Sequence, residues 1–117
     1  MVELRIDGET LVLTVKGLDK LFALKSKLEI PLENVAGAHA DPKIARGWWK
    51  GIRAPGTHIP GVIVAGTFYQ ADKKIFWDVH NPERTIVIDL KDERYDQLIV
   101  EVKDPDLAVE LIERAIA

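Results

Sequence analysis

The stretch IFWDVHNPERTIVIDLKDERYDQLIVEV, residues 75–102, decides the fold. Apolar residues recur in it at every second position, which predicts β-strands with one buried face. The three groups are Ile75, Trp77 and Val79; Ile86, Ile88 and Leu90; and Leu98, Val100 and Val102. Asn81-Pro82 and the polar segment 91–96 separate these groups and predict turns. Because Phe76 alternates with Trp77 along its strand, we expect one of these two aromatic side chains to face outward.

The next segment, DPDLAVELIERAIA at residues 104–117, changes to the spacing of a helix. Asp104 suits the N-cap position, and Pro105 suits the first helical position. Apolar residues form one stripe along this helix, with charged residues opposite. The stripe consists of Leu107, Ala108, Leu111, Ile112, Ala115 and Ile116. The pattern predicts an amphipathic helix that covers part of the sheet.

The N-terminal half adds a hairpin, a short helix and further strands. Apolar and polar residues alternate on both sides of Asp7-Gly8, which predicts a β-hairpin with its turn there. Residues 18–25, LDKLFALK, have helical spacing and predict a short helix. Further strands are expected at residues 28–32, where Pro31 confines the strand to an edge or a bend, at 35–40 and at 62–69.

Together these patterns predict one domain over residues 1–117, in the mainly β (α+β) class. The pattern indicates about seven or eight short strands, a short inserted helix and a C-terminal capping helix. Most connections between consecutive strands are too short for parallel crossovers, so we expect an antiparallel sheet. Such a sheet hides its edges by closing into a small barrel or a bent sandwich, whose open end the terminal helix covers.

Composition narrows the classes of function. The net charge of −3 gives no field that would attract nucleic acid or an anionic membrane, so we expect no nucleic-acid partner. The chain has no cysteine, which excludes thiolate nucleophiles and suits a reducing cytosol. No apolar run approaches the ~20 residues of a membrane span, and the N-terminus is unlike a signal peptide. We therefore expect a cytoplasmic protein without a transmembrane segment.

Five segments carry a resemblance to a known fold: IPLENVAG (30–37), GTFY (66–69), IFWDV (75–79), TIVIDL (85–90) and LIVEVKDPD (98–106). They resemble the pleckstrin-homology-like (PH-like) fold, in particular its small bacterial branch. The segment GIRAPGTHIPG (51–61) is similar to a Gly/Pro-rich segment in bacterial PH-like proteins of unknown function. The resemblance implies a small barrel that binds lipids, peptides or proteins without catalysis, through its loops or its open edge.

The first hairpin departs from the phosphoinositide-binding members of that fold. Those members use basic residues on the first hairpin and its loop. The corresponding loop here, Asp7-Gly8-Glu9-Thr10, is acidic and would repel a phosphate. We therefore expect no phosphoinositide at this hairpin and favour a protein as the partner. The open strand edges of such a fold also allow a homodimer.

The passage RGWWKGIRAPGTHIPG, residues 46–61, is the candidate binding site. Glycines let a backbone approach a ligand, basic residues attract anions, and tryptophans stack on planar groups. Residues 41–61 have a net charge of +3, from four basic residues and one acid, within a chain of net charge −3. The predicted site consists of Arg46, Trp48, Trp49, Lys50, Arg53, Gly56 and His58. The alternative interpretation is a connection whose tryptophans fill the core.

Catalysis and metal binding find little support in the sequence. His39-x-Asp41 and Asp78-x-His80 could hold zinc only if their strand ends met, and we favour solvated polar residues instead. No phosphate loop, dinucleotide fingerprint or nucleophile elbow is present, so we expect no cofactor and no enzyme. The leading hypothesis is a non-catalytic binding or adaptor module for protein–protein interaction. The alternatives are a binder of small anionic ligands through residues 46–61 and, more remotely, a metal-dependent enzyme.

Overall fold

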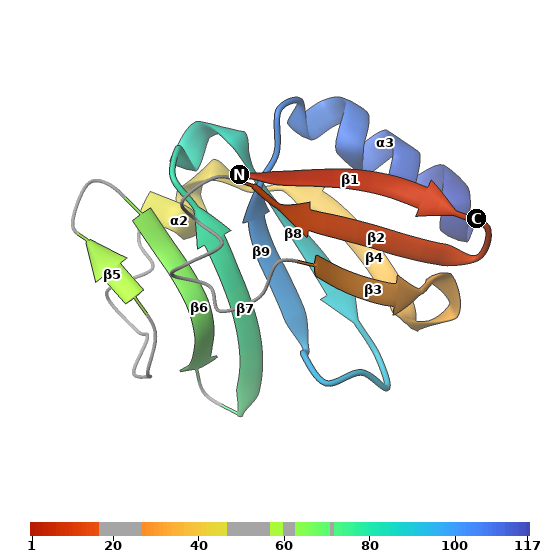
Figure 1. Cartoon of the computed structure of the whole chain (residues 1–117), viewed down its shortest axis with the longest axis horizontal. Coiled ribbons are helices and arrows are strands. Elements are labelled where there is room, and N and C mark those ends of the chain that lie inside the picture. Colours follow the sequence, from red (N-terminus) through yellow and green to blue (C-terminus); the bar gives the residue numbers. More distant parts are fainter. Residues whose placement is uncertain (17–26, 47–56, 60–62, 71) are drawn as a thin grey trace.

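The computed structural model describes residues 1–16, 27–46, 57–59, 63–70 and 72–117, whose strands form two sheets (Figure 1). The smaller sheet has the order β1-β2-β3 and the larger sheet the order β4-β8-β9-β7-β6-β5. The strands are β1 (Val2–Asp7), β2 (Thr10–Val15), β3 (Lys27–Pro31), β4 (Val35–Ala40), β5 (Thr57–Ile59), β6 (Ile63–Gln70), β7 (Lys73–Val79), β8 (Thr85–Leu90) and β9 (Gln97–Glu101). The helices are α2 (Pro42–Arg46), α3 (Pro105–Ile116) and the short 3₁₀ turns η1 (Leu32–Asn34) and η3 (Pro82–Arg84). The helix predicted at residues 18–25 lies outside the described residues.

The first hairpin forms as the sequence predicts. Strands β1 and β2 pair antiparallel from Val2 opposite Val15 to Asp7 opposite Thr10. Gly8 begins the two-residue turn with a φ of 63°, a left-handed conformation that glycine adopts without strain. The turn therefore fixes the register that places Leu4 and Ile6 of β1 on the same face of the sheet as Leu11 and Leu13 of β2.

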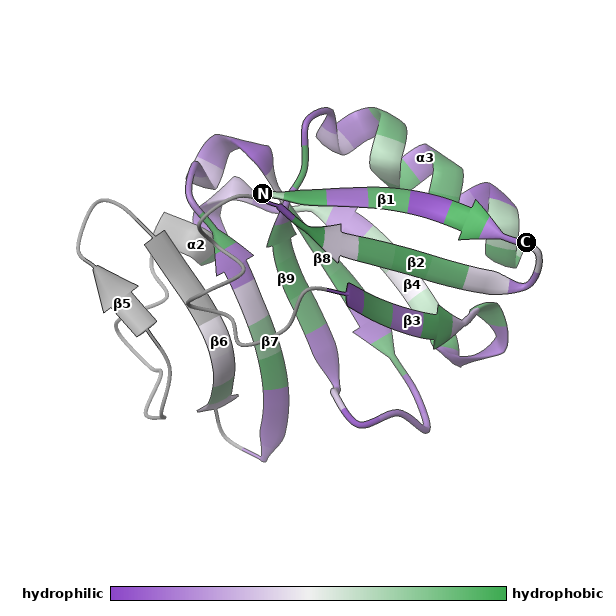
Figure 2. Cartoon of the chain, viewed as in Figure 1, coloured by the Kyte–Doolittle hydropathy of each residue, from purple (hydrophilic) through white to green (hydrophobic). Residues whose placement is uncertain are grey.

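The two sheets pack face to face, and the small sheet crosses in front of the large one (Figure 1). Their facing sides form the main core, which α3 closes with Ala108 and Ile112. Figure 2 shows the apolar residues along β2, β8 and β9, and the apolar side of α3. The prediction for α3 is confirmed: an oxygen of Asp104 accepts a hydrogen bond from the Leu107 N–H at 3.2 Å, and Pro105 follows the cap.

The large sheet is covered on both faces, which corrects the expectation for Phe76 and Trp77. Both side chains are fully buried, so neither faces outward. Phe76 lies in the core between the sheets, with its ring centroid 5.7 Å from that of Tyr95. Trp77 lies in a second cluster with Phe68, at 6.4 Å, and Ile44 of α2 packs against this cluster. Alternation predicted the two faces correctly, but it gives no information on what covers each face.

The strand topology also differs from the expectation. Strands β7 and β9 are parallel neighbours, with Ile75 opposite Gln97 and Asp78 opposite Val100. The connection that allows this is residues 80–96, which contain β8 on the far side of β9. A crossover of this length can join parallel strands, whereas each shorter connection alone could not. No strand pairing joins the two sheets among the described residues, so the barrel is not closed. The prediction of a mainly β fold is confirmed, and that of a wholly antiparallel barrel is wrong.

A buried carboxylate connects the end of β9 to the turn after β7. The Glu101 carboxylate accepts hydrogen bonds from the N–H groups of His80 and Asn81, at 2.8 and 3.1 Å.

No helix within the described ranges combines the length and the apolar character needed to cross a membrane.

Candidate interaction site

The passage predicted as the binding site lies mostly outside the described residues. Trp48, Trp49, Lys50, Arg53 and Gly56 belong to the part that the structure does not describe. For Arg46 and His58 it describes the backbone: Arg46 ends α2, and His58 is the middle residue of β5. Strand β5, which the sequence did not predict, pairs with β6 as the last strand of the large sheet. The assignment of a site to residues 46–61 stays a prediction.

The two histidine–aspartate pairs lie on strands that are far apart. His39 is on β4, with its ring nitrogens 3.8 Å from Asp41 and 4.0 Å from Asp89. Asp78 is on β7 and buried, 3.3 Å from the Met1 amino nitrogen. Strands β8 and β9 separate β4 from β7, so the two pairs are about 14 Å apart at the usual strand spacing. In the described part of the chain, no three His, Cys, Asp or Glu side chains group as metal ligands would.

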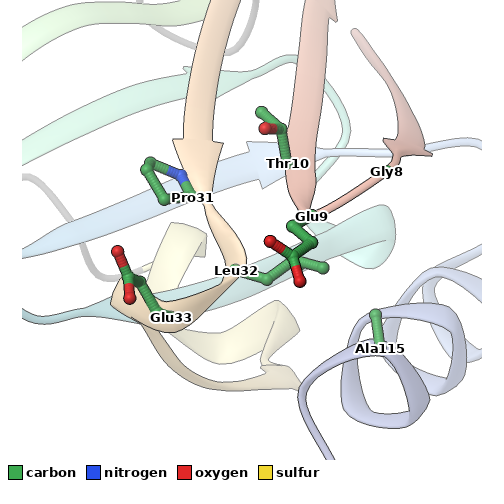
Figure 3. Close-up of a pocket in the computed structure, with 7 residues that line it drawn as sticks. All are labelled: Gly8, Glu9, Thr10, Pro31, Leu32, Glu33 and Ala115. Carbon is green, nitrogen blue, oxygen red and sulfur yellow. The ribbon is translucent and has the colours of Figure 1, made fainter.

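A pocket of about 510 Å³ lies beside the turn of the first hairpin (Figure 3). Its described lining is Gly8, Glu9, Thr10, Pro31, Leu32, Glu33 and Ala115. These residues include two glutamates and no lysine, arginine or histidine, and Ala115 belongs to the C-terminal turn of α3, the negative end of the helix dipole. The electrostatic environment of the pocket therefore disfavours an anionic head group.

A second hollow, the β1–α3 groove, lies between the edge of β1 and helix α3. It has a volume of about 290 Å³. Its lining is Val2, Glu3 and Leu4 of β1; Val102, Lys103 and Asp104; and Leu107, Ala108 and Leu111 of α3. Leu107 is 61% exposed and Leu111 is 40% exposed, one helical turn apart. They are two of the three large apolar side chains that are exposed among the described residues.

One edge of β1, beside this groove, carries backbone groups that point away from β2. The Lys16 N–H donates to the Met1 carbonyl at 2.9 Å, so Met1 and Lys16 form a hydrogen-bonded pair. Bonded and non-bonded pairs alternate along an antiparallel ladder. The N–H and C=O groups of Val2, Leu4 and Ile6 therefore point away from β2. Among the residues that the structure describes, no strand pairs with this edge of β1.

The outer edges of β3 and β4 are protected, unlike that of β1. Next to β3, the Leu32 N–H donates to the Glu9 carbonyl at 2.8 Å. Because bonded and non-bonded pairs alternate along the ladder, the backbone of Pro31 faces the outer edge of β3, and proline has no N–H to offer there. In β4, the Ala38 N–H donates to Glu113 Oε1 of α3 at 3.2 Å. The pairing of β4 with β8 also shifts register between Val35 and Gly37. Proline, a bulge and a covering helix are recurrent means of blocking strand addition.

The sequence pattern missed Leu107 and Leu111 as surface residues. It placed them in the apolar stripe of the C-terminal helix, but only Ala108 and Ile112 of that helix are buried. The signal that could have identified them is the width of the stripe. Six apolar positions cover more of the helix surface than a single packed face requires.

Comparisons of the chain with protein-family models, with curated proteins and with solved structures found no match.

Proposed function

We propose that this chain is a non-catalytic protein-interaction module that binds an extended protein segment as an added strand at the free edge of β1. The observation that carries the proposal is the β1–α3 groove, in which a strand edge that pairs with no other described strand lies beside the exposed Leu107 and Leu111. Strand addition to an open sheet edge is a recurring mode of peptide recognition. The bound backbone pairs with the edge, and neighbouring pockets select alternate side chains.

The groove suits a segment with apolar residues at alternate positions. A strand added to β1 would pair with the outward groups of Val2, Leu4 and Ile6. Every second side chain of that strand points to the core side of the sheet, where the groove lies. Covering Leu107 and Leu111 would yield part of the ~1.5–3 kcal/mol that complete burial of a leucine contributes. Backbone pairing therefore supplies general affinity, and the groove supplies the preference for apolar residues.

We retain the PH-like scaffold and a cytosolic location as parts of this proposal. The PH-like resemblance supports a binding role, and the open pair of sheets with a C-terminal helix is compatible with such a scaffold. The absence of cysteine suits the reducing cytosol.

A library of random linear peptides, selected on the whole chain, tests the proposal. We expect selected peptides to alternate apolar with polar residues and to shift the NMR amide signals of Val2, Leu4 and Ile6. The Leu107→Asp/Leu111→Asp double variant should weaken their binding by about tenfold or more, because it places charge in an apolar groove. Arg114→Ser is the matched control, since Arg114 is exposed on the same helix and does not line the groove.

The control variant should bind these peptides as the unmodified chain does. Peptides that bind without shifting the β1 amides, or that bind the double variant equally well, would overturn the proposal. A selection that enriches no peptide, on a chain that is monomeric under the conditions of the selection, would also overturn it. A thermal unfolding curve for each variant confirms that the chain remains folded.

A further inference from the structure

We infer that the strand accepted by the β1 edge is β1 of a second copy of this chain. Two copies would pair antiparallel about Leu4 and join their small sheets into one continuous sheet. The inference rests on the proposed function of the β1 edge and names its partner. A two-fold dimer requires a patch that is complementary to itself, and the sequence VELRID of β1 has this property.

The backbone groups of β1 fit this arrangement. With Leu4 opposite Leu4 of the second copy, Val2 lies opposite Ile6 of the second copy. These residues are the ones whose N–H and C=O groups point to the free edge, so three hydrogen-bonded pairs form and exchange about six hydrogen bonds. A two-fold axis on Val2 or Ile6 would leave only one such pair within the strand. A shift of one copy by a single residue would place backbone groups already bonded to β2 opposite these edge groups.

The charges of β1 also favour this register over its neighbours. With Leu4 at the centre, Glu3 lies opposite Arg5 of the second copy, and two-fold symmetry forms this pair twice. An axis on Arg5 would instead place Arg5 opposite itself and Glu3 opposite Asp7. An axis on Glu3 would place Glu3 opposite itself. Opposite charges across a strand pair are favourable and like charges are unfavourable. The charges therefore favour the register centred on Leu4 over those centred on Glu3 or Arg5.

The apolar face completes the fit. Val2, Leu4 and Ile6 of the second copy project to the core side of the sheet, where the groove offers Leu107 and Leu111. Leu4 and Ile6 are only partly buried in the single chain, although they pack against the main core. Pairing of two copies would cover both residues. The strand pattern that the groove requires, apolar at alternate positions, is the pattern of β1 itself.

Charge reversal in β1 provides the test. We expect sedimentation velocity on the unmodified chain to show a reversible dimer at twice the 13.1 kDa of one chain. Glu3→Arg and Arg5→Glu should each weaken the dimer by about tenfold, because each turns both cross-strand ion pairs into like-charge contacts. Mixing the two single variants should restore association. In a dimer of one variant with the other, opposite charges face each other at positions 3 and 5, whereas in a dimer of either variant with itself like charges do. Both positions are exposed, so the variants should stay folded.

Each outcome separates this inference from the proposed function. A chain that stays monomeric, while selected peptides still bind at β1, would overturn the inference and leave the proposed function in place. A dimer that neither charge reversal weakens, or variants that do not associate on mixing, would also overturn the inference. A monomer for which no peptide is selected would overturn both. Protection of the Leu4 and Ile6 amides from hydrogen exchange, rising with protein concentration, would support the pairing.

Discussion

The edges of β1 and β4 lie on either side of helix α3. The helix covers the edge of β4, whereas a groove separates it from the edge of β1. Along β4 the helix packs against the strand and directs Glu113 to the Ala38 N–H, so it covers that edge. Toward β1 the same helix presents exposed leucines across a groove, and no described strand pairs with that edge. A single amphipathic helix can therefore stabilise one strand and prepare a docking surface beside another. The comparison makes the two sides of α3 separable by substitution.

The largest expected effect comes from the helix side that packs on the core. Ile112→Ala removes a fully buried side chain and should lower the free energy of unfolding by about 2–5 kcal/mol. Leu107→Ala, on the exposed side, should change it by less than about 0.5 kcal/mol. Urea unfolding monitored by circular dichroism measures both values. Equal destabilisation by the two variants would mean that the groove side of α3 also holds the fold together.

A smaller effect is expected from the glycines next to the two edges. Gly8 has a φ of 63°, and a Cβ added to it would meet none of the described atoms within 4 Å, so Gly8→Ala should cost about 1–2 kcal/mol through backbone strain alone. Gly37, beside the bulge of β4, has no left-handed φ, and its added Cβ would meet Glu113 Oε1 at 3.8 Å, an ordinary contact. Gly37→Ala should therefore leave stability unchanged or raise it by up to about 1 kcal/mol.

The same unfolding experiment compares the two glycine variants. If Gly37→Ala were the more damaging change, the β4 edge would have less room for the helix than its geometry indicates. If Gly8→Ala had no cost, the turn of the first hairpin would adopt another conformation, and the register of β1 would no longer rest on it.

The sequence predicted the elements that depend on local periodicity. It did not predict features that depend on which segments pack side by side in the fold. The hairpin at Asp7-Gly8 and the capped helix from Pro105 follow from local signals, and both formed as expected. The parallel pairing of β7 with β9 could not be predicted in the same way, because periodicity indicates which face a residue occupies and not which strand lies beside it. Periodicity also could not predict that Trp77 is buried, because it does not indicate that Ile44 of α2 packs against that face of the sheet.

The candidate site was harder to predict than the fold. Glycines, tryptophans and basic residues drew attention to residues 46–61, because those residue types recur in binding loops. The β1 edge carries no such signal, since its residues are those of any amphipathic strand. What distinguishes it from the edges of β3 and β4 is the protection of those two edges, by Pro31 in β3 and by α3 along β4, and that is a property of the assembled fold.

The smallest expected effect tests how α3 closes the β4 edge. Glu113→Ala removes the acceptor for the Ala38 N–H and should lower the free energy of unfolding by about 1 kcal/mol, the usual net contribution of one hydrogen bond. Glu110→Ala is the matched control, because Glu110 is an exposed glutamate on the same helix that pairs with Arg114 at 2.6 Å. An exposed pair of this spacing contributes only about 0.3–0.5 kcal/mol.

Hydrogen exchange shows which strand edge the Glu113→Ala substitution affects, which a difference in the free energy of unfolding does not. In Glu113→Ala the Ala38 amide should exchange faster, while the Leu4 amide on the β1 edge should keep its rate at a concentration where the chain is monomeric. Unchanged exchange at Ala38 would show that packing of α3 against β4 covers this edge without the hydrogen bond. The two edges would then differ in apolar contact alone, and covering Leu107 and Leu111 with a partner would be enough to make the β1 edge resemble that of β4.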